Sequence, residues 1–140
     1  MREIKFRAWN PENKSMVEFD NEKAANDIYI AKHLLNLIAN KHELGENLLM
    51  QFTGLQDKNG VDIYEGDVIK TYHFTSRANG KFEYINHIVK WSEKFHGWFL
   101  LNCESMDEND GSIQFFVHLR ANKDFEITGN IHCNPQLLEK

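Results

Sequence analysis

The sequence has no hydrophobic run long enough to cross a membrane, because no apolar stretch approaches the ~20 residues that a spanning helix requires. It also shows no secretory signal, since residues 1–5 lead directly into charged, strand-like sequence. Its two cysteines, Cys103 and Cys133, form no CxxC pattern, and without a secretory signal they are expected to be free thiols in a reducing compartment. We therefore expect a cytoplasmic protein with no membrane partner.

An excess of positive charge is also absent. The formal net charge is −5, whereas a dedicated binder of nucleic-acid backbone usually carries a basic stripe. No internal repeat, low-complexity run or linker divides the 140 residues, so we expect a single domain over residues 1–140. A chain of this length buries enough surface to form a core without disulfides or a metal.

Aromatic residues and short alternating segments are what the sequence does contain. Ten Phe, four Tyr and three Trp make up 12% of the chain, and such side chains suit half-buried pleated surfaces. Alternation over residues 4–9, a turn at 10–13 and a returning apolar segment at 16–19 predict an N-terminal β-hairpin. Further strand-like segments follow at 48–55, 61–64, 68–72, 82–91, 98–101, 113–119 and 125–132. Their spacing of roughly 8–12 residues predicts a mainly β fold, a small SH3-like or partly open barrel.

One segment has a helical rather than a strand-like pattern. Its apolar residues recur at intervals of three and four, which places on one helix face Ala24, Ile28, Ala31, Leu35 and Ile38. We predict a helix near residues 21–42 that covers one face or end of the sheet. The alternative is that its apolar face binds a partner or a second copy of the chain.

A second, shorter helical element is predicted near the end of the sequence. Residues 134–138 are expected to form a capped helical turn that packs against the rest of the protein.

The densest run of turn signals lies in residues 50–70. Asn59-Gly60 is typical of a tight β-hairpin turn, because such a turn needs positive φ at its central residues. Gly54 indicates a bulge, and Gly66 indicates a second reversal in which Asp67 bonds to backbone N–H groups. This stretch is therefore interpreted as two β-corners that set the strand register.

Three segments resemble the YopX family of phage and prophage proteins. They are KFRAWN near the start, MQFTGLQDKNGVDIYEGDVI in the middle and EITGNIHCNPQLL at the end. The resemblance implies a mostly β fold with a small barrel and a phage or prophage origin. It implies no biochemical activity, and no catalytic or binding residues come with it.

Catalytic and metal chemistry find little support in the sequence. His118, His132 and Cys133 are potential ligands, with Cys103 and His96 in neighbouring loops, but their spacing matches no closed zinc site. The side chains of His132 and Cys133 would point to opposite faces of a strand. The plentiful carboxylates form no catalytic pattern. We expect no enzymatic activity, no cofactor and no metal.

Two binding roles remain open. Edge strands of an open barrel invite strand addition or oligomerisation, so we expect a protein-interaction module that binds a partner or itself. The alternative is an accessory nucleic-acid-binding protein, since basic and aromatic residues gather in the first strand and in residues 68–91, Tyr84 among them. The candidate residues for that surface are Arg7, Trp9, Lys70, Tyr72, Arg77 and Lys90.

Overall fold

A computed structural model describes residues 3–11, 14–19, 49–74, 82–94, 96–104, 106, 114–115 and 125–138. These ranges contain nine strands and one 3-10 helix. The elements are β1 (Phe6–Asn10), β2 (Ser15–Phe19), β3 (Leu49–Gln56), β4 (Asp62–Tyr64), β5 (Asp67–Phe74), β6 (Phe82–Ser92), β7 (Gly97–Asn102), β8 (Gln114–Phe115), β9 (Glu126–Asn130) and η1 (Pro135–Leu138).

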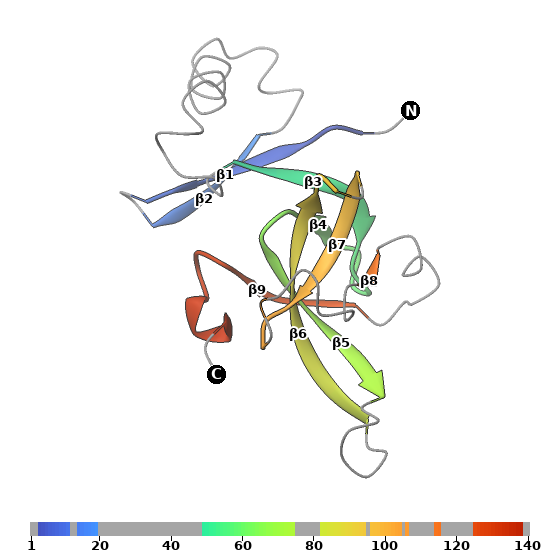
Figure 1. The fold of residues 1–140 in the computed structure, drawn as a ribbon. Helices are drawn as coiled ribbons and strands as arrows, with labels where there is room; N and C mark the ends of the chain where they lie inside the picture. Colours follow the sequence, from blue (N-terminus) through green and yellow to red (C-terminus); the bar gives the residue numbers. More distant parts are fainter. Residues whose placement is uncertain are drawn as a thin grey trace.

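The predicted mainly β fold is confirmed. A four-stranded sheet has the order β2-β1-β3-β4, and a five-stranded sheet has the order β8-β7-β6-β5-β9 (Figure 1). The five-stranded sheet curls into a half-barrel, which agrees with the predicted partly open barrel. The N-terminal hairpin is confirmed as well, with Phe6 opposite Phe19 and Asn10 opposite Ser15. The helix predicted near residues 21–42 lies outside the described residues, as does most of the strand predicted at 113–119.

Each face of the five-stranded sheet carries a buried hydrophobic cluster. Ile69, Val89 and Leu100 lie on one face, where Ile63 of the four-stranded sheet packs against them. The opposite face carries a second cluster, formed by Val68, Ile88, Phe99, Leu101 and Cys103. Residues 131–138 supply the apolar side chains that pack against this second cluster, so the predicted helical turn at the C-terminal end of the sequence is confirmed as η1. Consecutive apolar residues in β5, β6 and β7 follow from this double burial.

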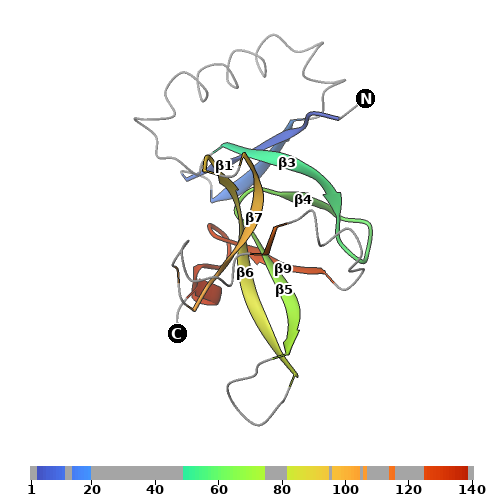
Figure 2. The ribbon, with the colours of Figure 1, turned by 45° about the vertical axis from the view of Figure 1, so that its right-hand side comes forward.

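Strands β5 and β6 continue beyond the rest of their sheet. β9 pairs with β5 only as far as Lys70, and β7 pairs with β6 only from His87 onwards. Residues 71–74 and 82–85 pair with each other and, within the described chain, with no third strand. Figures 1 and 2 show this pair, which we call the ribbon, projecting away from the four-stranded sheet.

The two reversals predicted in residues 50–70 are confirmed, but the first differs in its turn: Gly60 has positive φ whereas Asn59 does not, and the turn spans residues 57–60. Gly54, Gly60 and Gly66 all have positive φ, and the β3–β4 register shifts between Phe52 and Gln56, as expected for a bulge near Gly54. At the second corner, the Gly66 N–H donates to the Val89 carbonyl, while the Gly66 carbonyl accepts from the Ile131 N–H. Gly66, which directly precedes β5, is thereby bonded both to β6 and to the segment that follows β9.

Asp57 organises the first corner. Its Oδ1 accepts hydrogen bonds from the N–H groups of Asn59 and Val61, at 2.8 and 3.0 Å. Its Oδ2 accepts a longer hydrogen bond, of 3.4 Å, from the N–H of Ile127 in β9. Burial acts to raise the pKa of Asp57, but these backbone N–H groups outweigh burial and hold the pKa below its ordinary value.

The depressed pKa of Asp57 predicts a pH-dependent share of stability. This share is complete above about pH 4, near the unfolded pKa, and is lost as the pH falls through the lower folded value. Urea unfolding of the wild type and Asp57→Asn is expected to differ by about 1–3 kcal/mol at neutral pH, because the variant loses bonds to a charged acceptor. The difference should shrink towards pH 2. A difference that stays constant with pH would contradict the prediction.

Candidate functional site

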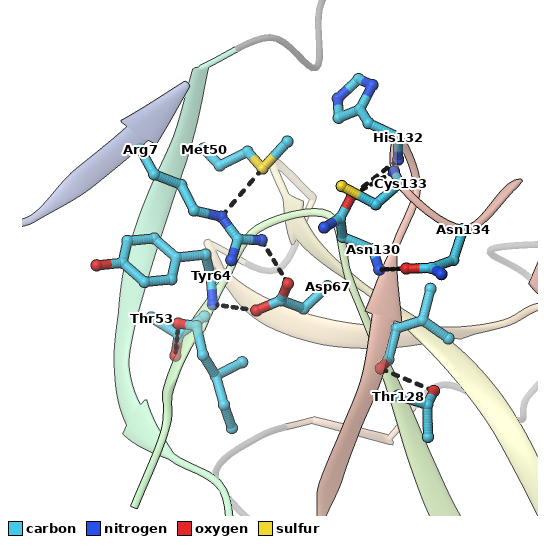
Figure 3. A network of polar contacts seen from close by, with 12 residues as sticks. Arg7, Met50, Thr53, Tyr64, Asp67, Thr128, Asn130, His132, Cys133 and Asn134 are labelled. Atoms are coloured by element: carbon cyan, nitrogen blue, oxygen red, sulfur yellow. Dashed lines mark hydrogen bonds and ion pairs between the residues drawn. The ribbon is translucent and has the colours of Figure 1, made fainter. Parts of the chain in front are cut away.

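A buried ion pair joins the two sheets. Arg7 extends from β1 to Asp67 at the start of β5, and their side chains are 11% and 1% exposed (Figure 3). Asp67 Oδ2 also accepts a hydrogen bond of 2.8 Å from the Tyr64 N–H. The Arg7 guanidinium carbon lies 4.6 Å from the centroid of the Tyr64 ring, and Nε lies 3.3 Å from the sulfur of Met50. One guanidinium thus contacts β3, β4 and β5.

The electrostatics of this pair suit a structural contact. Burial raises the pKa of Asp67, whereas the charge of Arg7 and the Tyr64 N–H oppose that rise. Both carboxylate oxygens of Asp67 have donors, so the pair satisfies the main requirement for burying charge. The predicted bond from Asp67 to a corner N–H is confirmed at Tyr64, and its pairing with Arg7 is an additional finding.

Two asparagine side chains hold the turn after β9. Asn130 Oδ1 accepts hydrogen bonds from the N–H groups of His132 and Cys133, at 3.0 and 2.8 Å (Figure 3). Asn134 Oδ1 accepts from the Asn130 N–H at 3.3 Å. A Cβ atom on Gly129 would lie 2.3 Å from that same Oδ1, so the Asn134 side chain occupies space that only glycine leaves open.

Trp9 and His132 connect the turn to the first strand. Their rings stack with centroids 5.3 Å apart and planes inclined by 7°. The Ile131 N–H bonds to Gly66, beside Asp67, so the turn contacts the same corner as Arg7. The three segments that carry the family resemblance therefore meet in one place, which we call the junction: residues 7–9, 64–67 and 129–134. The polar contacts described at the junction join Arg7 to Asp67 and the side chains of Asp67, Asn130 and Asn134 to backbone N–H groups.

The structure separates the residues proposed for a nucleic-acid surface. Arg7 and Trp9 belong to the junction. Lys70 on β5 places its Nζ 4.6 Å from the ring centroid of Tyr84 on β6. Strand pairing sets Tyr72 opposite Tyr84, and Lys90 lies further along β6 on the same sheet face as Tyr84. Arg77 lies outside the described residues.

The potential metal ligands do not gather. Within the described ranges, no three His, Cys, Asp or Glu side chains lie close enough to share a metal ion. Cys103 is buried in the core, and burial raises the pKa of its thiol to about 11. Cys133 is exposed in the turn after β9, His96 lies between β6 and β7, and His118 is outside the described residues. No helix of the described chain has the length and apolar character to cross a membrane.

Several junction residues had only weak sequence signals. Asn130 and Asn134 flank residues 131–133, and the only sequence signal for their role is the clustering of turn-forming residues after Gly129. The Trp9–His132 stack joins residues from distant parts of the chain, and alternation in β1 reveals only that Trp9 shares a face with Arg7.

The fold and the junction define the class of protein. It is a strongly curled β protein in which three separate sequence segments meet at one polar junction. The family model described as YopX protein matches residues 5–139, and the chain belongs to the YopX family. The crystal structure of protein EF1440 from Enterococcus faecalis has a similar fold, with a TM-score of 0.55 and 23% sequence identity over 99% of this chain and 100% of that chain. A search of curated proteins found no match.

The contact between Gly129 and Asn134 predicts a specific steric coupling. Gly129→Ala should lower the free energy of unfolding by about 1–3 kcal/mol, because the new methyl group displaces the Asn134 amide. In an Asn134→Ala background the same substitution should cost under ~1 kcal/mol, since the obstructing group is gone. Urea unfolding of the four proteins measures the coupling. Equal costs in both backgrounds would disprove it.

The Arg7–Asp67 pair predicts strong energetic coupling between the sheets. Arg7→Met or Asp67→Asn alone should cost about 3–5 kcal/mol of unfolding free energy, because each leaves a buried group without its partner. The double variant should cost much less than the sum. The matched control is the exposed Lys58–Glu126 pair, at 42% and 46% exposure, whose coupling should stay below ~1 kcal/mol. Similar couplings for both pairs would contradict the prediction.

Proposed function

We propose that this protein is a non-enzymatic protein-interaction module that self-associates through the ribbon. The observation that carries the proposal is the pairing of residues 71–74 and 82–85 with each other and with no third strand of the described chain. A two-stranded ribbon is marginally stable in water by itself, so an added strand would stabilise it. A phage or prophage setting, which the family resemblance implies, is part of the same proposal.

The backbone of β5 supports strand addition on the side where β9 ends. The Val68 carbonyl accepts from Thr128 Oγ1 and therefore faces β9. Because backbone groups alternate in direction along a strand, Lys70 and Tyr72 face the same side. Across the sheet, the Asn86 carbonyl accepts from the Cys103 N–H and so faces away from β5, which agrees with this orientation. The N–H and C=O of Tyr72 thus point to the β9 side of β5, beyond Lys70–Glu126, the last pair that β9 forms with β5 among the described residues.

A second copy of the chain suits this edge. Antiparallel pairing of one strand with its own copy about a twofold axis uses the same residues on both sides, which is the usual geometry of a homodimer. Main-chain hydrogen bonds supply the affinity in such strand addition, so no dedicated side chain is required. The absence of a catalytic role is proposed because Arg7 and Asp67, the buried charges of the junction, are engaged in structural contacts.

Proline at the edge tests the proposal. Tyr72→Pro removes an outward N–H but no bond within the β5–β6 pair, and should convert the self-associating protein into a monomer. Tyr72→Ala, the matched control, keeps the N–H and should still associate. Sedimentation velocity over a range of concentrations measures the mass, and circular dichroism verifies folding. A wild type that stays monomeric throughout, or a folded Tyr72→Pro protein that still associates, would refute self-association through this edge.

A further inference from the structure

Tyr84 is an unusually exposed aromatic residue on the projecting ribbon. Its side chain is 64% exposed, the largest exposure among the big hydrophobic residues of the described chain. Lys70 Nζ lies 4.6 Å from the ring centroid, so a cation–π contact holds the ring on one side. A ring that is fixed by a lysine and exposed to solvent offers a flat apolar surface on which a planar group can stack.

Lys70 is one of three lysines to consider around this ring. Lys58 pairs with Glu126 at 2.7 Å, and Glu126 lies opposite Lys70 in the β5–β9 register. The hydrogen bond to Glu126 raises the pKa of Lys58. Lys70 therefore contacts the ring directly, and Lys58 lies on the other side of the Glu126 carboxylate from Lys70. Lys90 adds a further positive charge on the same face, roughly 20 Å along β6.

We propose that this face of the ribbon binds single-stranded nucleic acid, with a base stacked on Tyr84 and phosphates bound by Lys70 and Lys58. An exposed aromatic ring stacks on unpaired bases and is of little use to a duplex, whose bases are already stacked. The surface differs from the ribbon edge, because the base lies on the sheet face whereas an added strand pairs in the plane of the sheet. The site extends the predicted basic–aromatic surface at Lys70 and Lys90 and does not use Arg7 or Trp9.

The small number of lysines limits the electrostatic contribution. Each phosphate contact on a single strand contributes about −0.7 to the slope of log affinity against log salt, so Lys58 and Lys70 together predict a slope of about −1.4. The net charge of −5 opposes additional non-specific contacts. Binding should therefore be strongest at low salt and depend on the ring as much as on the lysines.

Fluorescence anisotropy with a labelled oligothymidylate tests the site. Tyr84→Ala should weaken binding about tenfold, the effect of losing one stacked base, and Tyr84→Phe should retain it. Lys70→Gln should reduce the salt slope by about 0.7. Trp91→Ala is the matched control, since Trp91 is also exposed but lies on the opposite sheet face from Lys90, and it should bind as the wild type does.

Several results would overturn the proposal. These are no binding at low salt, equal binding by Tyr84→Ala and the wild type, equal loss in Trp91→Ala, or binding to duplex DNA as tight as to the single strand. Sedimentation of Tyr84→Ala separates this proposal from self-association, because the variant should keep the wild-type mass while losing nucleic-acid affinity. A variant that loses both properties would show that Tyr84 supports the ribbon itself, and would overturn the site.

Discussion

The contact on which the remaining structure depends is the ion pair between Arg7 and Asp67. Asp67 is almost fully buried, and a buried carboxylate is tolerated only with a charged partner and further donors. Arg7 supplies the charge from the other sheet, and the Tyr64 N–H supplies the additional donor. Because the planar guanidinium also covers the Tyr64 ring, the pair restricts both the separation and the rotation of the two sheets at this point.

The junction and the ribbon differ in how their polar groups are used. At the junction, side chains such as Asn130 and Asn134 satisfy backbone groups of a tight turn, and Trp9 covers His132. On the ribbon, within the part of the chain that the structure describes, β5 and β6 extend past the strands that pair with them, and Tyr84 is largely exposed. The ribbon therefore presents backbone edges and ring surface to solvent, whereas the junction keeps its polar groups within the protein.

Local features could be predicted from the sequence, and long-range contacts could not. The turns at Gly60 and Gly66 and the N-terminal hairpin follow from backbone preferences of a few adjacent residues. Alternation places Arg7 on one face of β1, but it does not reveal that Asp67, 60 residues away, lies opposite. Alternation alone therefore groups Arg7 with the surface cations. Equally, the glycine at 129 indicates a break in the strand, while its steric relation to Asn134 depends on how the following turn closes.

The distribution of the junction along the chain has a consequence for protein synthesis. Arg7 and Trp9 are translated early, whereas Asp67 follows 60 residues after Arg7 and His132 emerges later still. The N-terminal hairpin cannot bury its charge or cover its tryptophan until these partners have left the ribosome. Until then the nascent hairpin carries exposed strand edges, a state prone to pairing with other chains. Folding of the two sheets onto each other is consequently a late step, completed when the turn after β9 becomes available.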